Sequence, residues 1–262
     1  MKLPREKILQ NSYSIEELNI LLDYAEQALK EWKPIWSPFV SAQLREEIIN
    51  KFKDLNDISC IHNGGYSNAE RQRICFVRCE KETLSNDLNI PIKGLNIKGN
   101  FLFERARPDD FRKAIEDLGI NSGSIGDLWL IRDRGAQAMC SQECANLLDK
   151  KKSHLRDVEI TIQEFSTNEM EIPFQRVEKI IHTVEASKRV DAVASAGFGL
   201  SRSKITTQIK QGYLRVNWLT NYQTSKSINT GDIIHLERKG SLKILNIEKT
   251  KKERWKIKLL RQ

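Results

Sequence analysis

Apolar residues recur at helical spacing through the N-terminal third of the chain. Ser14 followed three residues later by Glu17 is typical of a helix start with a capping box. The apolar positions behind it are spaced i, i+3, i+4, i+7 and i+11 and are Leu18, Leu21, Leu22, Ala25 and Leu29. Two prolines then interrupt the pattern, and a second amphipathic stretch covers residues 41–52. The pattern predicts a helical N-terminal region over residues 1–72.

The middle of the chain changes to strand-like spacing, with two helical segments between the strands. Pro108 begins one helix and residues 141–152 form the second, capped by Ser141. The predicted strands cover residues 74–79, 90–97, 127–132, 136–140 and 158–165. The order ββαββαβ predicts an RRM-like or ferredoxin-like α/β domain over residues 73–166, and an α+β fold class for the whole chain.

Residues 167–173 are polar and acidic and end in proline, so we expect them to link the middle domain to a third domain over residues 174–262. That domain opens with a short helix from Arg189 to Gly197 and a second helix capped by Ser201. Strands follow at 214–216 and 233–236, and a basic hairpin from residues 242–247 and 255–259 closes the chain.

The two short helices and the strand after them resemble the S4-type RNA-binding domain. The matching positions are Arg189, Asp191, Gly197, Ser201, Arg202, Ile209, Gly212, Val216, Asn217, Gly231 and Asp232. Departures from the family pattern include Gln208 where it has leucine and Trp218 where it has glycine. The resemblance implies that this domain binds RNA.

The distribution of charge along the chain also favours RNA binding by the C-terminal domain. The last 89 residues hold 19 Lys and Arg against 7 Asp and Glu, a net charge of +12 within a chain total of +8. A basic segment on a near-neutral body is typical of a polyanion-binding protein. Arg202 lies in the first turn of its helix, where the backbone N–H groups already favour phosphate. The predicted RNA-binding residues are Arg189, Ser201, Arg202, Lys204, Lys210, Arg215, Asn217, Lys226, Lys251, Lys252 and Arg254, with Arg189, Arg202, Lys204, Lys210 and Arg215 on one surface.

Two further motifs indicate the family. One is Gly64-Gly65-Tyr66 with Ala69-Glu70-Arg71, and the other is Leu118-Gly119-Ile120 followed by Ile125-Gly126-Asp127. Together with the C-terminal domain they are similar to the YlmH-like family, whose cyanobacterial and plastid branch is called photosystem II S4 domain protein. The resemblance implies association with rRNA or the ribosome. From the residues themselves, Gly64-Gly65 permits a positive φ or a close backbone approach. We expect Glu70 and Arg71 to pair with neighbours and lock the helical region on the sheet, with direct RNA contact as the alternative.

Candidates for chemistry are weaker. Cys75 and Cys79, like Cys140 and Cys144, are four positions apart, whereas zinc sites more often use Cys-x-x-Cys, so we expect no metal and no cofactor. The four histidines are scattered and no nucleophile–base pattern emerges, so we expect no catalytic residue. No apolar run approaches bilayer length and the first ten residues lack a signal sequence, which predicts a cytoplasmic protein without membrane insertion.

These patterns favour a monomeric, non-enzymatic protein that docks on structured rRNA, with the N-terminal or middle domain free to contact a protein partner. Two alternatives stay open. One is an assembly factor for a photosynthetic complex with RNA binding secondary, and the other is an RNA-modifying enzyme whose site is not recognised.

Overall fold

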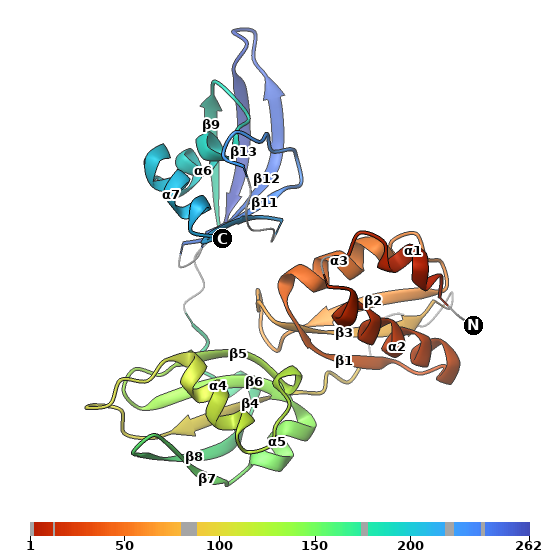
Figure 1. The fold of residues 1–262 in the computed structure, drawn as a ribbon, viewed down its shortest axis with the longest axis vertical. Helices are drawn as coiled ribbons and strands as arrows, with labels where there is room; N and C mark the ends of the chain where they lie inside the picture. The colour runs from red at the N-terminus through yellow and green to blue at the C-terminus, as the bar shows by residue number, and fades with distance from the viewer. Residues whose placement is uncertain (1–2, 13, 80–87, 174–177, 218–222, 237–238) are drawn as a thin grey trace. The chain divides into compact units, whose positions relative to one another are not determined.

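The computed structural model describes residues 3–12, 14–79, 88–173, 178–217, 223–236 and 239–262. The chain divides into two compact units, Met1–Pro173 and Phe174–Gln262. The first unit holds two antiparallel sheets and the second holds one, each covered by helices (Figure 1). This is the expected α+β class.

The N-terminal part of the first unit packs helices against a three-stranded sheet. Its helices are α1 (Arg5–Leu9), α2 (Ile15–Glu31) and α3 (Ala42–Phe52), and its strands are β1 (Ile35–Val40), β2 (Ile58–Asn63) and β3 (Gln72–Arg78). The apolar stripe of α2 is buried against the sheet, as its spacing predicts. Ser14 occupies the N-cap position of α2, but its side chain makes no capping bond, so the expected capping box is absent.

The strand expected at residues 74–79 belongs to a different sheet from the one we expected. It is β3, the central strand of the order β1-β3-β2, so the expected domain boundary at residue 73 falls just inside this strand. Alternation of apolar residues predicts a strand but not the strands with which it pairs. Here the loop from Gly64 to Arg71 connects β2 to β3, and the two strands pair with each other. Strand β1 was missed because of its proline, Pro38, which sits at a register shift on the edge of the sheet.

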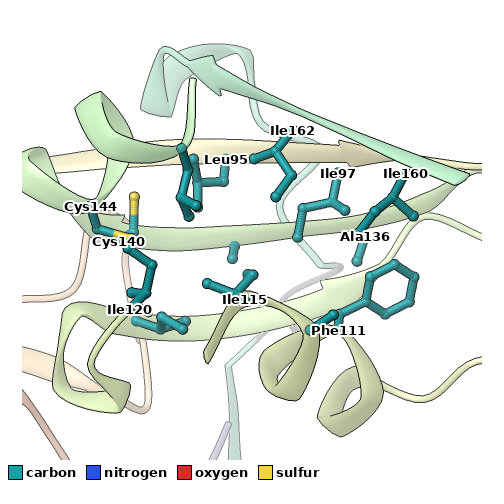
Figure 2. Close-up of a cluster of buried hydrophobic side chains, with 14 of the residues drawn as sticks. Leu95, Ile97, Phe111, Ile115, Ile120, Ala136, Cys140, Cys144, Ile160 and Ile162 are labelled. Atoms are coloured by element: carbon teal, nitrogen blue, oxygen red, sulfur yellow. The ribbon is translucent and has the colours of Figure 1, made fainter. Parts of the chain in front are cut away.

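The middle domain has the βαββαβ arrangement of ferredoxin-like folds with one strand added. The elements are β4 (Ile92–Lys98), α4 (Pro108–Glu116), β5 (Ile125–Leu130), β6 (Gly135–Ser141), α5 (Gln142–Leu148), β7 (Lys152–Leu155) and β8 (Val158–Phe165), in the sheet order β5-β6-β4-β8-β7. Both helices cover one face, and apolar side chains from helices and strands meet between them (Figure 2). The second helix ends at Leu148, before its expected end at residue 152, and the added strand β7 begins at Lys152.

Residues 167–172 are part of the middle domain rather than a free linker. They contain the short 3₁₀ helix Thr167–Glu169, and Met170 is buried against Phe39, Ile92 and Met139. The indole of Trp129 donates a 2.9 Å hydrogen bond to the carbonyl oxygen of Glu171. Although the segment is mostly polar, the buried side chain of Met170 holds it on the sheet.

The second unit is a five-stranded antiparallel sheet with two helices on one face. The elements are β9 (Lys179–Glu185), α6 (Val190–Phe198), α7 (Arg202–Lys210), β10 (Leu214–Val216), β11 (Ile233–Leu236), β12 (Gly240–Lys249) and β13 (Trp255–Arg261), in the order β10-β11-β12-β13-β9. Strand β9 was not predicted. At Gly197 a Cβ would collide with Leu242, so glycine lets α6 lie close to the sheet.

Candidate nucleic-acid interface

The turn between α6 and α7 is built by backbone capping at both sides. Gly199 ends α6 in the left-handed conformation, with φ of 67°. The hydroxyl of Ser195 donates to the carbonyl oxygen of Leu200, which fixes the turn. Ser201 then accepts a 3.3 Å hydrogen bond from the backbone N–H of Lys204. The Ser201 hydroxyl thus serves as the N-cap of α7, and its structural effect is to place Arg202 in the first turn.

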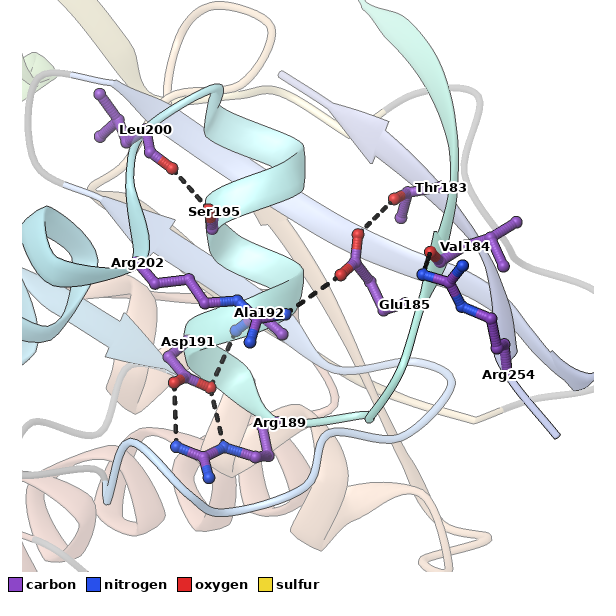
Figure 3. A network of polar contacts seen from close by, with 10 residues as sticks. All are labelled: Thr183, Val184, Glu185, Arg189, Asp191, Ala192, Ser195, Leu200, Arg202 and Arg254. Atoms are coloured by element: carbon purple, nitrogen blue, oxygen red, sulfur yellow. Dashed lines mark hydrogen bonds and ion pairs between the residues drawn. The ribbon is translucent and has the colours of Figure 1, made fainter.

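Arg189 is held by the carboxylate of Asp191. Its Nε and Nη2 atoms donate to the two Asp191 oxygens at 3.1 and 3.0 Å, a bidentate pair (Figure 3). Asp191 is only 6% exposed and also accepts from the N–H of Ala192. These hydrogen bonds raise the pKa of Arg189 above its usual range. The Arg189 side chain stays 46% exposed, so the guanidinium is fixed in place while its remaining N–H groups face solvent.

Arg202 is positioned in a similar way, by a carboxylate on strand β9. Its Nη2 atom lies 3.4 Å from an oxygen of Glu185 on β9, and the Arg202 side chain is 54% exposed (Figure 3). Glu185 is itself oriented by the Thr183 hydroxyl, which donates to it at 2.6 Å. An exposed ion pair of this kind contributes only about 0–1 kcal/mol, so it orients Arg202 without preventing contact with a phosphate.

The structure brings some of the predicted residues together at the N-terminal ends of α6 and α7. Arg189 and Arg202 both lie along α6 (Figure 3). Lys204 follows Arg202 in α7, and the backbone of Lys226 adjoins the start of α6, where its carbonyl oxygen accepts from the N–H of Val190 at 3.0 Å. An isolated β-bridge between Arg189 and Ser227 fixes the same segment. We call Arg189, Arg202, Lys204 and Lys226 the helix-side cluster.

Other predicted residues lie elsewhere. Arg215 sits between Leu214 and Val216, which are buried under the helices, so its side chain points to the opposite, open face of the sheet. The expectation that Arg215 shares one surface with Arg202 is therefore wrong. Alternation along a strand shows that Arg215 points away from the core, but it does not show which face of the sheet the helices cover. Lys210 follows Lys204 by six positions, which turns it to another flank of α7.

Asn217 and the basic residues of the β12–β13 hairpin lie outside the helix-side cluster. The Asn217 amide donates to Asp232 and accepts from the N–H of Ile233, both at 2.9 Å, so its side chain is used to hold the turn. Lys251 and Lys252 are exposed at the tip of the β12–β13 hairpin, and Arg254 donates to the carbonyl oxygen of Val184. These hairpin cations form a second basic location within the unit.

The open face of this sheet carries further basic residues. Lys256 and Lys258 alternate with buried Ile257 and Leu259, as the sequence pattern of the tail predicts. Lys243, directly across from Leu260 on the same face, was missed. Its signal is the alternation of buried Leu242 and Ile244 around it.

The glycine and arginine motifs of the first unit join its two sheets. The Asp127 carboxylate accepts from the Tyr66 hydroxyl and the Glu70 N–H at 2.7 Å, and from the Arg71 N–H at 2.9 Å. The Arg71 guanidinium donates to the carbonyl oxygens of Ile125 and Phe39. Burial, and then the Asp127 charge, raise the pKa of Tyr66. The expected locking role of this motif is thus confirmed.

The cysteines differ in their surroundings. Cys140 and Cys144 interact, and the hydrogen bond with Cys140 lowers the pKa of Cys144. Cys75 lies on β3 and Cys140 on β6, in separate sheets. Burial raises the pKa of Cys60 to about 12 and that of Cys75 to about 11, which keeps both thiols protonated near neutral pH. Within the described ranges, no group of three or more His, Cys, Asp or Glu residues could hold a metal ion.

Comparison with known proteins identifies relatives of the chain. Residues 13–80 match the family model described as YlmH, N-terminal. The chain is 25% identical over 247 residues, 91% of its length and 94% of the relative's, to the Ribosome-associated protein quality control protein P2 of Bacillus subtilis (strain 168). A solved structure, the cell division protein ylmH from Streptococcus pneumoniae, aligns with a TM-score of 0.47 at 17% identity, covering 61% of this chain and 96% of that one.

The family model and the Bacillus subtilis relative confirm the resemblance to YlmH-like proteins. The matched family model covers the N-terminal region, and so the S4-type character of the second unit stays a prediction. Where the structure describes the chain, it contains no helix long and apolar enough to cross a membrane.

Proposed function

We propose that this YlmH-like chain is a non-enzymatic RNA-binding protein that docks on structured rRNA of the ribosome. Its Bacillus subtilis relative is a ribosome-associated quality control protein, which supports the association with ribosomes. The basic second unit supports RNA as the direct partner. In this proposal the protein works in the cytoplasm, and the second unit is an S4-type domain.

The helix-side cluster is the observation that carries the proposal. Arg189 and Arg202 are each held by a carboxylate of low exposure, yet both guanidinium groups reach solvent. Cations fixed before binding lose less side-chain freedom when a phosphate arrives, which favours binding. Lys204 and Lys226 add charge beside them. Contacts to phosphate and RNA shape, rather than to base edges, are the usual means of recognising structured RNA.

Two charge-reversal variants on opposite faces of the second unit test this assignment. Arg202→Glu with Lys204→Glu changes the helix-side cluster, and Lys243→Glu with Lys256→Glu makes the same charge change on the open sheet face. We expect the first variant to weaken binding to purified 23S rRNA fragments and to flatten the plot of log affinity against log salt by about 1.4–1.8 for two lost phosphate contacts. We expect the control variant to retain most of the slope.

Ribosome co-sedimentation completes the test. The wild-type chain should travel with large subunits at low salt and be released as salt rises, and the Arg202→Glu/Lys204→Glu variant should stay in the light fractions. Equal affinity of the two charge-reversal variants would refute the helix-side assignment. No arrangement among the described residues favours the assembly-factor or RNA-modifying alternatives, so neither is proposed.

A further inference from the structure

The loop between β4 and α4 in the middle domain exposes apolar side chains. Phe103 is 93% exposed and Leu102 is 60% exposed, and Leu130 at the end of β5 is also exposed. Large exposed apolar residues that lie together more often mark a binding site than an ordinary surface. The motifs and the proposed function leave this loop without a role.

The loop is held in its conformation at both ends. At its start, Gly99 donates to the carbonyl oxygen of Arg134 at 3.1 Å and Phe101 donates to that of Asp133 at 2.8 Å. At its end, Arg156 donates to the Glu104 carboxylate at 2.8 Å and to the carbonyl oxygen of Arg105 at 3.1 Å. The apolar residues are thus presented by a fixed turn, which lowers the entropy cost of binding.

A surface pocket of about 310 Å³ lies beside this loop. It is lined by side chains of mixed character, including Phe101, Leu102, Phe111, Arg105, Arg132 and Asp133. The rings of Phe101 and Phe111 meet edge to face, with centroids 4.9 Å apart. Its apolar wall therefore includes two aromatic rings, and its polar residues are two arginines and one carboxylate.

The charges around the pocket favour an anionic occupant. Arg105, Arg107 and Arg132 are exposed, and no carboxylate among the described residues lies within ion-pair distance of any of them. Nearby arginines differ, because Arg134 pairs with Glu171 and Arg156 pairs with Glu104 and Asp110. Arg105 and Arg132, the two lining cations without a carboxylate partner among the described residues, fit a ligand with both phosphate groups and flat apolar rings.

We propose that this pocket binds an unstacked nucleotide of single-stranded RNA. The base enters the pocket against Phe101 and Leu102, and the next base stacks on the exposed Phe103 ring. Arg105 and Arg132 contact the flanking phosphates. The Asp133 carboxylate accepts a hydrogen bond from an exocyclic amine, which selects cytosine over uracil. This site lies in the first unit, so it goes beyond the function proposed for the second.

Fluorescence anisotropy with labelled octaribonucleotides of cytidine and of uridine tests the site in the full chain. Phe103→Ala should weaken binding of the cytidine octamer by about 5- to 150-fold, the range for one lost stacking contact. Leu147→Ala is the matched control, because Leu147 is 59% exposed on α5 of the same domain. Arg105→Glu with Arg132→Glu should also weaken binding, against the exposed control Lys151→Glu.

Asp133→Asn tests the base preference separately. The wild type should prefer the cytidine octamer to the uridine octamer by about fivefold, and the variant should bind both alike. Ultraviolet crosslinking of the cytidine octamer, followed by peptide mapping, should place the crosslink within residues 99–107.

Several results would overturn the proposal. One is an affinity of Phe103→Ala for the octamer within twofold of wild type, and another is crosslinks confined to residues 174–262. The third is a Phe103→Ala variant that no longer co-sediments with ribosomes but binds the octamer with unchanged affinity, which would assign the loop to a protein contact. The Arg202→Glu/Lys204→Glu variant separates this inference from the proposed function, because it should lose rRNA binding and keep the crosslink at residues 99–107.

Discussion

The Asp127 carboxylate is a point at which a single substitution should loosen the connection between the two sheets of the first unit. It accepts hydrogen bonds from the Tyr66 hydroxyl and from the N–H groups of Glu70 and Arg71. A hydrogen bond to a charged group contributes about 1.5–3 kcal/mol. The Glu70 N–H is exposed and recovers a water partner, whereas the other two donors are partly buried. Asp127→Ala should therefore lower the free energy of unfolding by about 3–6 kcal/mol.

A double-mutant cycle isolates one of these bonds. Tyr66→Phe keeps the ring against Trp129, with centroids 5.7 Å apart, and removes only the hydroxyl. It should cost about 1.5–3 kcal/mol alone and much less once Asp127 is alanine, which gives a coupling energy of about 1.5–3 kcal/mol. Urea denaturation followed by tryptophan fluorescence measures all four proteins. Asp157→Asn, on the exposed β7–β8 turn, is the control. A coupling energy near zero, or a cost of Asp127→Ala below about 1 kcal/mol, would refute the reasoning.

Three further predictions concern packing, the helix-side cluster and pH. Gly197→Ala should destabilise the second unit by about 1–3 kcal/mol in thermal denaturation, because the new methyl group collides with Leu242; a rise in Tm would contradict this. Asp191→Ala should cost about 1–2 kcal/mol and should also weaken rRNA binding, since Arg189 loses its bidentate support; unchanged affinity would show that Arg189 needs no orientation. The free energy of unfolding should fall between about pH 8.5 and pH 12, because the Cys60 thiol ionises at a lower pH in the unfolded chain than in the folded protein. At pH 10 this thiol alone should lower the free energy of unfolding by about 1–2 kcal/mol. Cys60→Val should flatten the dependence of the urea midpoint on pH.

Helices were the most predictable part of the fold because their evidence is local. The apolar spacing of α2 and the caps of α3 and α7 lie within a few residues of the elements they define. Strands depend on partners distant in sequence. The residues of β3 were expected as a strand but in the wrong sheet, and β9, which carries Glu185, was missed. Its seven residues are all exposed or half-buried, because it forms the edge of the sheet.

The candidate site was predictable in its residue types and less so in its geometry. The sequence pattern placed Arg189, Arg202 and Lys204 near one another, which the capped turn and the Asp191 pair explain. Arg215 points to the other face because the sheet, and not its own strand, determines where the helices lie. Asn217 matched the S4-type pattern for a structural reason, since its amide is used within the turn.

The hydrogen bonds of Asp127 also bear on how the first unit can be divided. A cut between Cys79 and Leu88 would leave the donors Tyr66, Glu70 and Arg71 on one fragment and their acceptor on the other. The apolar contact of Phe39 with Met139 would be divided in the same way. Each fragment would expose a surface that fits only its counterpart. The two halves should therefore reassociate when mixed, and neither half should be the natural unit for expressing or exchanging this part of the protein.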